Sequence, residues 1–120
     1  MIDNSSLHIS QKVHEMRLAA HPFSQILRGE KTLEIRLFDE KRRALSVGDA
    51  IVFCERDTKK TVRARITALF RFSSFREAFS ALSRSEMGFS EAEDANAMYR
   101  YYSPEEEAKW GVLVIQIALV

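Results

Sequence analysis

The sequence has little of what disulfide-bonded, secreted or membrane-spanning proteins require. Its 120 residues include one cysteine, Cys54, so an internal disulfide is excluded and we expect a reducing, cytoplasmic location. Because Cys54 ends the apolar run Ile51–Cys54, we interpret it as a small buried side chain rather than a nucleophile. No apolar run approaches the ~20 residues of a membrane span, and the N-terminus lacks a basic-then-apolar signal pattern. We therefore expect no membrane partner.

Histidine and glycine are also scarce. The three histidines lie near the N-terminus, without ligand spacing toward Cys54 or a carboxylate cluster. The four glycines include no G-x-G array of the kind that cradles phosphates. The sequence therefore predicts neither a metal ion nor another cofactor. With a net charge of +1, nucleic-acid binding would depend on a local basic patch rather than on a global field.

The hydrophobic fraction, 46%, is ordinary for a globular protein with a buried core. We expect a flexible segment over residues 1–12 and one domain over residues 13–120. Alternating apolar and polar residues, or short apolar runs, predict strands. The segments concerned are Val13–Ala19, Thr32–Leu37, Ala50–Glu55, Thr61–Phe72 and Trp110–Val120. The last is mostly apolar, which favours a central strand buried on both faces.

Short helices are predicted between these strands. Pro22 suits the first position of a helix whose buried face would hold Phe23, Ile26 and Leu27, with Gly29 ending it. A serine followed three residues later by glutamate is typical of a helix start. This pattern predicts a helix after Ser74, a second from Ser90 to about Tyr101, and a short turn after Ser103. The charged segment 39–43 is interpreted as a connection. The order β-α-β-β-β-α-α-β favours an α+β fold, a small mixed β-barrel with short helices covering one opening.

Charged residues concentrate in the stretch Gly29–Arg36. Thr32, Glu34 and Arg36 alternate with apolar residues, so a carboxylate and a guanidinium should share one face of a strand. Lys31 precedes the strand, so the pleat does not fix its direction. The two cations suit phosphate or carboxylate recognition, whereas Glu34 could hold Arg36 in position or accept a hydrogen bond from the exocyclic amine of a base. The alternative is an ordinary surface ion pair.

The pattern Gly29-x-Lys31-x-x-Glu34-x-Arg36, followed by Val47-Gly48-Asp49 and a strand, resembles the ASCH (activating signal cointegrator homology) family. The late segment, from Met98 through the tyrosines to Trp110-Gly111-Val112, is also similar. The resemblance implies a PUA-like β-barrel with a cleft at its mouth that receives RNA or a nucleotide. The cleft residues it implies here include Lys31, Glu34 and Arg36. Together with Thr32 and Tyr101 they form the predicted RNA- or nucleotide-binding set.

An enzymatic alternative comes from the same resemblance. Some small ASCH proteins are amidohydrolases of N4-acylated cytidine that use a lysine, a threonine three residues later and a downstream glutamate. Lys31 matches the lysine, but Glu34 occupies the threonine position and Thr32 has the wrong spacing. A hydrolase would therefore depend on Lys31, Glu34 and Glu86 as catalytic residues. Ribonuclease activity has also been attributed to family members.

Further basic and aromatic residues could extend a nucleic-acid surface. Arg63, Arg65 and Arg71 are predicted to share one strand face, and further basic residues lie in turns: Arg42, Arg43, Lys59 and Lys60. Tyr99, Tyr101 and Tyr102 could stack on unpaired bases or pack in the core. A third interpretation is a protein-interaction module that uses the segment 91–102. The sequence does not predict an oligomeric state.

Overall fold

The computed structural model describes residues 11–120, so most of the segment predicted to be flexible, residues 1–12, lies outside the described residues. Within that range five strands form one mixed sheet in the order β1-β3-β4-β5-β2. The strands are β1 (Val13–Leu18), β2 (Leu33–Leu37), β3 (Ala50–Glu55), β4 (Thr61–Phe72) and β5 (Val112–Leu119). β1 runs parallel to β3, and the other three pairings are antiparallel.

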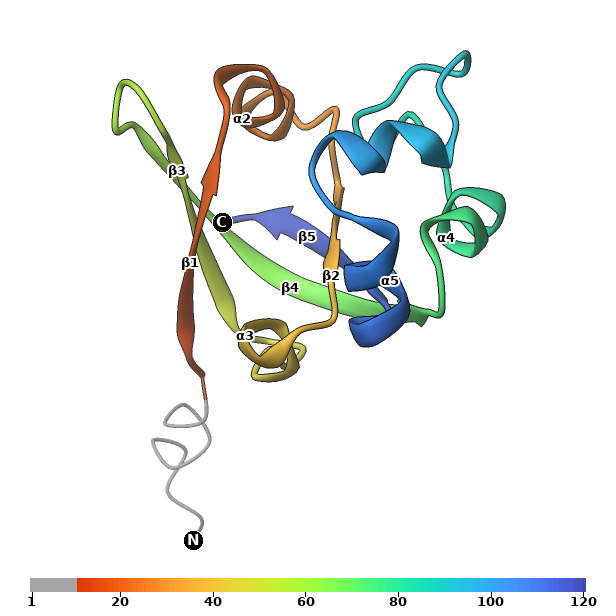
Figure 1. Ribbon diagram of the computed structural model, residues 1–120. Helices are drawn as coiled ribbons and strands as arrows, with labels where there is room; N and C mark the ends of the chain where they lie inside the picture. The colour runs from red at the N-terminus through yellow and green to blue at the C-terminus, as the bar shows by residue number, and fades with distance from the viewer. Residues whose placement is uncertain (1–10) are drawn as a thin grey trace, which may run out of the picture.

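The sheet curls into a half-barrel (Figure 1). β1 and β2 stand at opposite ends of the strand order, yet a side chain of one reaches the other: Arg36 Nη2 donates a hydrogen bond to the carbonyl oxygen of Arg17 at 3.2 Å. The seam between these two strands therefore lacks a backbone ladder and is bridged by a guanidinium. The predicted α+β class and curled sheet are confirmed.

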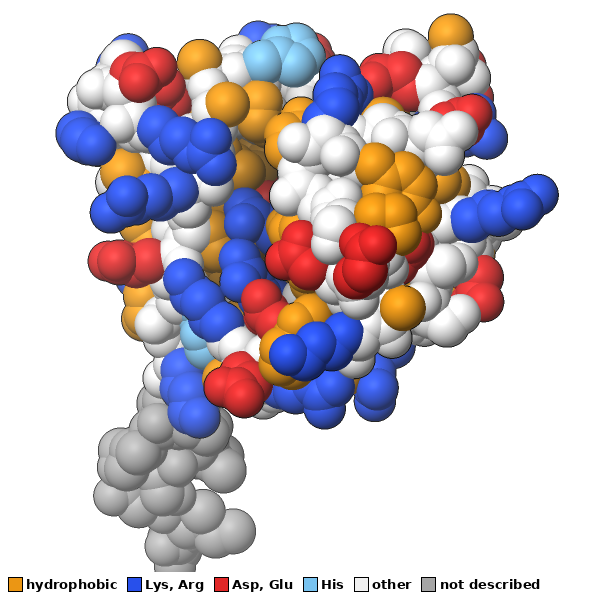
Figure 2. Space-filling model, in the orientation of Figure 1, with side chains coloured by type: hydrophobic (Ala, Val, Ile, Leu, Met, Phe, Trp, Pro, Cys, Tyr) orange, Lys and Arg blue, Asp and Glu red, His pale blue; other side chains and the backbone are white. Residues whose placement is uncertain are grey.

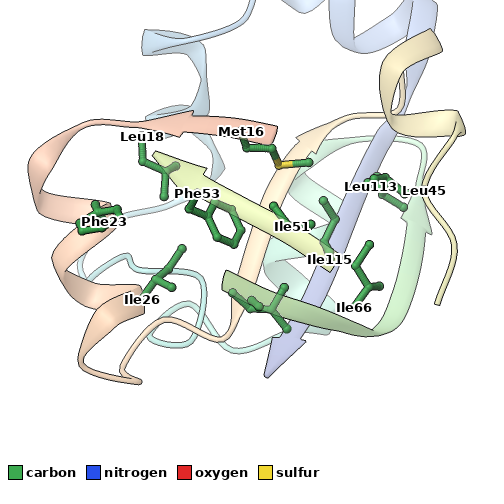
Figure 3. Packing of buried hydrophobic residues seen from close by; sticks show 12 residues of the cluster. Met16, Leu18, Phe23, Ile26, Leu45, Ile51, Phe53, Ile66, Leu113 and Ile115 are labelled. Carbon is green, nitrogen blue, oxygen red and sulfur yellow. The ribbon is translucent and has the colours of Figure 1, made fainter. Parts of the chain in front are cut away.

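β5 is an interior strand, as its apolar sequence predicted. It pairs with β4 on one side and β2 on the other. Leu113, Ile115 and Ile117 pack into a cluster with β1, β3 and α2, part of which Figure 3 shows. Val112 and Val114 point to the opposite face and pack against α4 and its neighbours. Burial on both faces explains why the strand is almost entirely apolar, with Gln116 as its one polar residue.

A bulge in β4 changes one prediction. The register shifts between Ile66 and Ala68, so Arg65 lies opposite Ala118 whereas Arg71 lies opposite Leu113. Successive side chains of a strand point to opposite faces of the sheet, so Ala118 and Leu113, which are five residues apart, lie on opposite faces. The prediction that Arg71 shares a face with Arg63 and Arg65 was therefore wrong. Arg71 instead stacks on Phe38, with its guanidinium carbon 4.2 Å from the ring centroid.

The helical elements are short and lie around the sheet. They are α2 (Ala20–Leu27), α3 (Glu40–Arg43), α4 (Phe75–Ala81), the 3₁₀ helix η1 (Ala95–Arg100) and α5 (Pro104–Trp110). Phe23 and Ile26 are buried in α2, but Leu27 is 53% exposed because the eight-residue helix presents only a narrow face to the core. The charged connection contains α3, which starts where Asp39 accepts a hydrogen bond from the Arg42 backbone N–H.

The C-terminal third differs from the prediction at two points. The Ser90–Glu93 signature closes a turn, in which the Ser90 N–H donates to the Glu93 carboxylate, and the helix starts only at Ala95 behind the cap Asp94. The same side-chain hydrogen bonds that cap helices also stabilise isolated turns, so the pattern is ambiguous. The predicted turn after Ser103 is the full helix α5, with a complete capping box. It ends at Trp110, which is therefore helical and not part of β5.

Candidate functional site

The polar face of β2 points into the molecule. Leu33, Ile35 and Leu37 pack into the core beside α4, so the alternate residues Glu34 and Arg36 face the opposite way, toward the seam with β1. Glu34 is only 3% exposed, and the Arg36 side chain is 15% exposed. Because both side chains are largely buried, the alternative interpretation of Glu34 and Arg36 as an ordinary surface ion pair is wrong.

Lys31, Glu34 and Arg36 converge on one point. The Lys31 Nζ lies 2.8 Å from Glu34 Oε1, while Arg36 Nη2 and Nε lie 2.9 and 3.1 Å from Glu34 Oε2. Each carboxylate oxygen therefore faces its own cation. We call these three residues the charged cluster.

The charged cluster keeps Glu34 ionised. Burial alone raises the pKa of the Glu34 carboxyl, but the charges of Lys31 and Arg36 and their hydrogen bonds outweigh it, and the pKa falls to about 2. Burial likewise disfavours the charged form of Arg36, yet the Glu34 carboxylate raises the pKa of the guanidinium. At neutral pH the cluster thus holds two cations and one anion.

Lys31 is positioned by Gln25 of α2 and by the distant loop that carries Gly88. Its backbone N–H donates to the Gln25 carbonyl at 3.1 Å, just after Gly29 ends α2 with a φ of 76°. Gly88, also at positive φ, lies against the lysine stem: a Cβ there would lie 3.1 Å from Lys31 Cδ and 2.8 Å from Gln25 Oε1. Gly88 therefore belongs to the site, although nothing in the local sequence marked it.

The charged cluster lines a cleft of about 660 Å³. One side comes from β1 and α2, another from the loop Met87–Phe89, and a third from η1 and the residues that follow it. Arg17, Arg56 and Arg100 add three guanidiniums, so the lining holds five lysine and arginine side chains and two carboxylates, those of Glu34 and Glu93. Figure 2 shows Lys and Arg side chains along this hollow. The local excess of positive charge contrasts with the nearly neutral chain.

Comparison with known proteins identifies the family. The family model of the ASCH domain matches residues 16–120. The chain belongs to the ASCH domain family. The resemblance stated from the motif is thereby confirmed.

Solved structures agree with this assignment. The hypothetical protein PH0355 has 27% identity and a TM-score of 0.77 over 90% of this chain and 99% of that chain. Protein PF0455 from Pyrococcus furiosus has 29% identity and a TM-score of 0.67 over 90% and 97%. ASCH from Zymomonas mobilis shares the fold at 19% identity, with a TM-score of 0.65 over 89% of this chain and 67% of that chain. A search of curated proteins found no match.

In this ASCH domain a buried carboxylate holds together the helices that carry the aromatic residues beside the cleft. Glu107 of α5 accepts hydrogen bonds from the Phe75 backbone N–H and the Tyr99 hydroxyl, both at 2.6 Å. This arrangement ties α4, η1 and α5 together beside the cleft. Tyr102 stacks on Phe75 at 5.7 Å between ring centroids, and Tyr101 is 65% exposed at the cleft. The sequence pattern did not single out Glu107, which appears only as one of three consecutive glutamates.

The remaining predicted site residues lie elsewhere. The Thr32 hydroxyl donates to Glu86 Oε1 at 3.1 Å, and the backbone N–H groups of Thr32 and Leu33 donate to the Glu86 carbonyl. Neither Thr32 nor Glu86 is among the residues that line the cleft. Arg63, Arg65 and Arg71 do not line it either. The structure therefore groups Lys31, Glu34, Arg36 and Tyr101, and separates them from Thr32 and Glu86.

Two further observations concern the described range, residues 11–120. It contains no group of three His, Cys, Asp or Glu side chains that could hold a metal ion. None of its helices is long and apolar enough to cross a membrane.

Proposed function

We propose that this ASCH domain binds RNA or a nucleotide in the cleft, with the charged cluster at its floor. The observation that carries the proposal is the burial of two cations and one carboxylate in a cleft lined by five lysine and arginine side chains and two carboxylates. Keeping such charges away from water is costly unless they have partners, and buried ionic groups concentrate at functional sites. An anionic ligand would add a favourable partner.

The dimensions and walls of the cleft also suit a nucleotide. A volume of about 660 Å³ falls within the range of small-ligand sites, which span roughly 300–1,000 Å³. The exposed Tyr101 offers a flat surface of the kind on which unpaired bases stack. Arg17 and Arg56, on the β1 and β3–β4 side, would contact phosphates of a longer strand.

Hydrolysis of an N4-acylated cytidine or of RNA is the second candidate, and the geometry favours it less. The lining contributed by residues 11–120 contains no serine, threonine or cysteine, so neither an aliphatic hydroxyl nor a thiol is available as a nucleophile. Both oxygens of Glu34 already face cations, and its low pKa makes it a weak base. Glu86 contacts Thr32 instead. Incubation with N4-acetylcytidine and with short RNAs decides the matter: turnover above that of the Lys31→Ala and Glu34→Gln variants would establish the hydrolase.

The binding experiment compares two double variants. Fluorescence anisotropy with a labelled single-stranded RNA is measured over a range of salt concentrations for the wild type, for Lys31→Ala/Arg36→Ala and for the control Arg63→Ala/Arg65→Ala. We expect the first variant to lose affinity and to show a shallower salt slope, because each lost phosphate contact removes about 0.7 from the single-strand slope. The control should retain both. Unchanged affinity and slope in the first variant would refute the proposal.

A further inference from the structure

The charged cluster has spare hydrogen-bond donors and little spare acceptor capacity. An ionised carboxylate offers about four acceptor positions, and Lys31 and Arg36 already occupy three on Glu34. An ammonium has three donors, and Glu34 is the sole acceptor that residues 11–120 place against Lys31 Nζ. A ligand group that reaches this floor therefore meets donors and must supply acceptors.

The net charge at the floor also favours a ligand group that is anionic and accepts hydrogen bonds. Two cations and one carboxylate leave an excess of one positive charge, although Lys31 is 7% exposed and Glu34 is 3% exposed. The second carboxylate of the cleft, Glu93, does not offset this excess because it lies 2.9 Å from Arg100 and pairs with it. A buried excess charge is stabilised by a counter-charge, not by the amino group of a base.

The aromatic surface lies at a different depth. Tyr101 is 65% exposed, in contrast to the buried floor, and the guanidinium carbon of Arg100 lies 5.8 Å from its ring centroid. A ring so exposed is available to stack on a base at the rim, whereas a group bound beside Lys31 would lie among buried side chains. The cleft thus separates a donor-rich, positively charged floor from an aromatic rim.

Building on the proposed function, we infer that the floor binds a phosphate group of the nucleotide and that the base lies outward against Tyr101. Lys31 and Arg36 donate hydrogen bonds to phosphate oxygens, and Glu34 acts as a positioning residue that holds both cations. The exocyclic amine of a base, which the sequence left open as a partner of Glu34, does not reach the floor. The phosphate is that of a free nucleotide, of a strand end or of an internal linkage.

The test uses two pairs of ligands, and the two members of each pair differ only in one phosphate group. Dissociation constants at low salt are measured by calorimetry or competition for uridine, for uridine 5′-monophosphate, and for a short oligouridylate with either a 5′-phosphate or a 5′-hydroxyl. We expect the monophosphate to bind about 10- to 100-fold more tightly than uridine, the effect of one or two charge-assisted hydrogen bonds. In Lys31→Met this preference should shrink at least several-fold, whereas Arg63→Met should keep it.

Each outcome has a defined meaning. A preference for the 5′-phosphorylated oligonucleotide places a terminal phosphate at the floor. Equal binding of both oligonucleotides, with uridine much weaker than its monophosphate, places an internal phosphate there. Equal binding of uridine and its monophosphate by a protein that still binds RNA would overturn this inference and leave the proposed function standing. Failure to bind any RNA or nucleotide would refute the proposed function itself. The wild-type comparison needs no variant, so it does not depend on how Lys31→Met folds.

Discussion

Replacing Glu34 with glutamine tests the energetic role of the charged cluster. The substitution keeps the shape of the side chain but removes the negative charge that faces Lys31 and Arg36. In the folded protein the pKa of Glu34 lies at about 2 instead of 4.5, so ionisation of this group favours the folded state by about 3 kcal/mol at neutral pH. Breaking a buried ion pair by removing one partner typically costs about 3–5 kcal/mol. We therefore expect Glu34→Gln to lower the free energy of unfolding by about 3 kcal/mol.

The assay is chemical denaturation at neutral pH, with Glu30→Gln as the matched control. Glu30 also pairs with an arginine, at 3.0 Å from Arg28, but both side chains are more than half exposed. Exposed pairs of this kind contribute little to stability, so the control should unfold like the wild type. A loss below about 1 kcal/mol in Glu34→Gln would show that the charged cluster is not the buried, mutually dependent unit described above.

The same pair of proteins tests the pH dependence. Because folding lowers the pKa of Glu34, its contribution is fully present above the unfolded value, near 4.5, and is lost as the pH falls toward about 2. The difference in unfolding free energy between the wild type and Glu34→Gln should therefore shrink across this window. Other carboxylates titrate in both proteins and cancel in the difference. A difference that stays constant between pH 5 and about pH 2 would contradict the assigned pKa.

Three further predictions concern the walls of the cleft. Gly88→Ala should lower the free energy of unfolding by about 1–2 kcal/mol because its φ is positive, and it should also weaken RNA binding because the new methyl group displaces Lys31. The control Gly48→Ala, at φ +96 with open space around it, should lower the free energy of unfolding by a similar amount and leave the RNA affinity unchanged. Tyr101→Ala should weaken RNA binding by about 1–3 kcal/mol in anisotropy titrations without a change in thermal stability, because the ring is 65% exposed. Glu107→Ala should lower the free energy of unfolding by about 1–3 kcal/mol in denaturation experiments, since it leaves a buried backbone N–H without its acceptor.

The strands could be predicted because their signals are local. The bounds of β3 and the run of β4 followed from alternation and turn residues, and β5 followed from an apolar run that both core clusters use. The bulge at Ile66–Ala68 had no local signal, and it moved Arg71 to the face opposite Arg65. The capping signature at Ser90 failed for a different reason, since the same side-chain hydrogen bonds serve a turn as well as a helix.

The candidate site could be predicted only in part. The period of two placed Glu34 and Arg36 on one face, but the direction of Lys31 depends on contacts with Gln25 and Gly88, the latter 57 positions away in the printed sequence. The loop that carries Gly88 is held by the Glu86 carbonyl, which accepts hydrogen bonds from the backbone N–H groups of Thr32 and Leu33, where β2 begins. Such contacts between distant segments produce no periodic pattern in the sequence, so they could not be predicted from it. The pairing of Thr32 with Glu86 likewise follows from this packing.

The proposed function requires RNA or a nucleotide to occupy the cleft above the charged cluster. An NMR titration of the labelled protein with a single-stranded RNA detects this occupancy residue by residue. We expect the largest chemical-shift changes at Lys31, Arg36, Gly88 and Tyr101, with the β4 face that carries Arg63 and Arg65 unaffected. Changes confined to that β4 face, with the cleft residues unmoved at saturation, would contradict the proposed function.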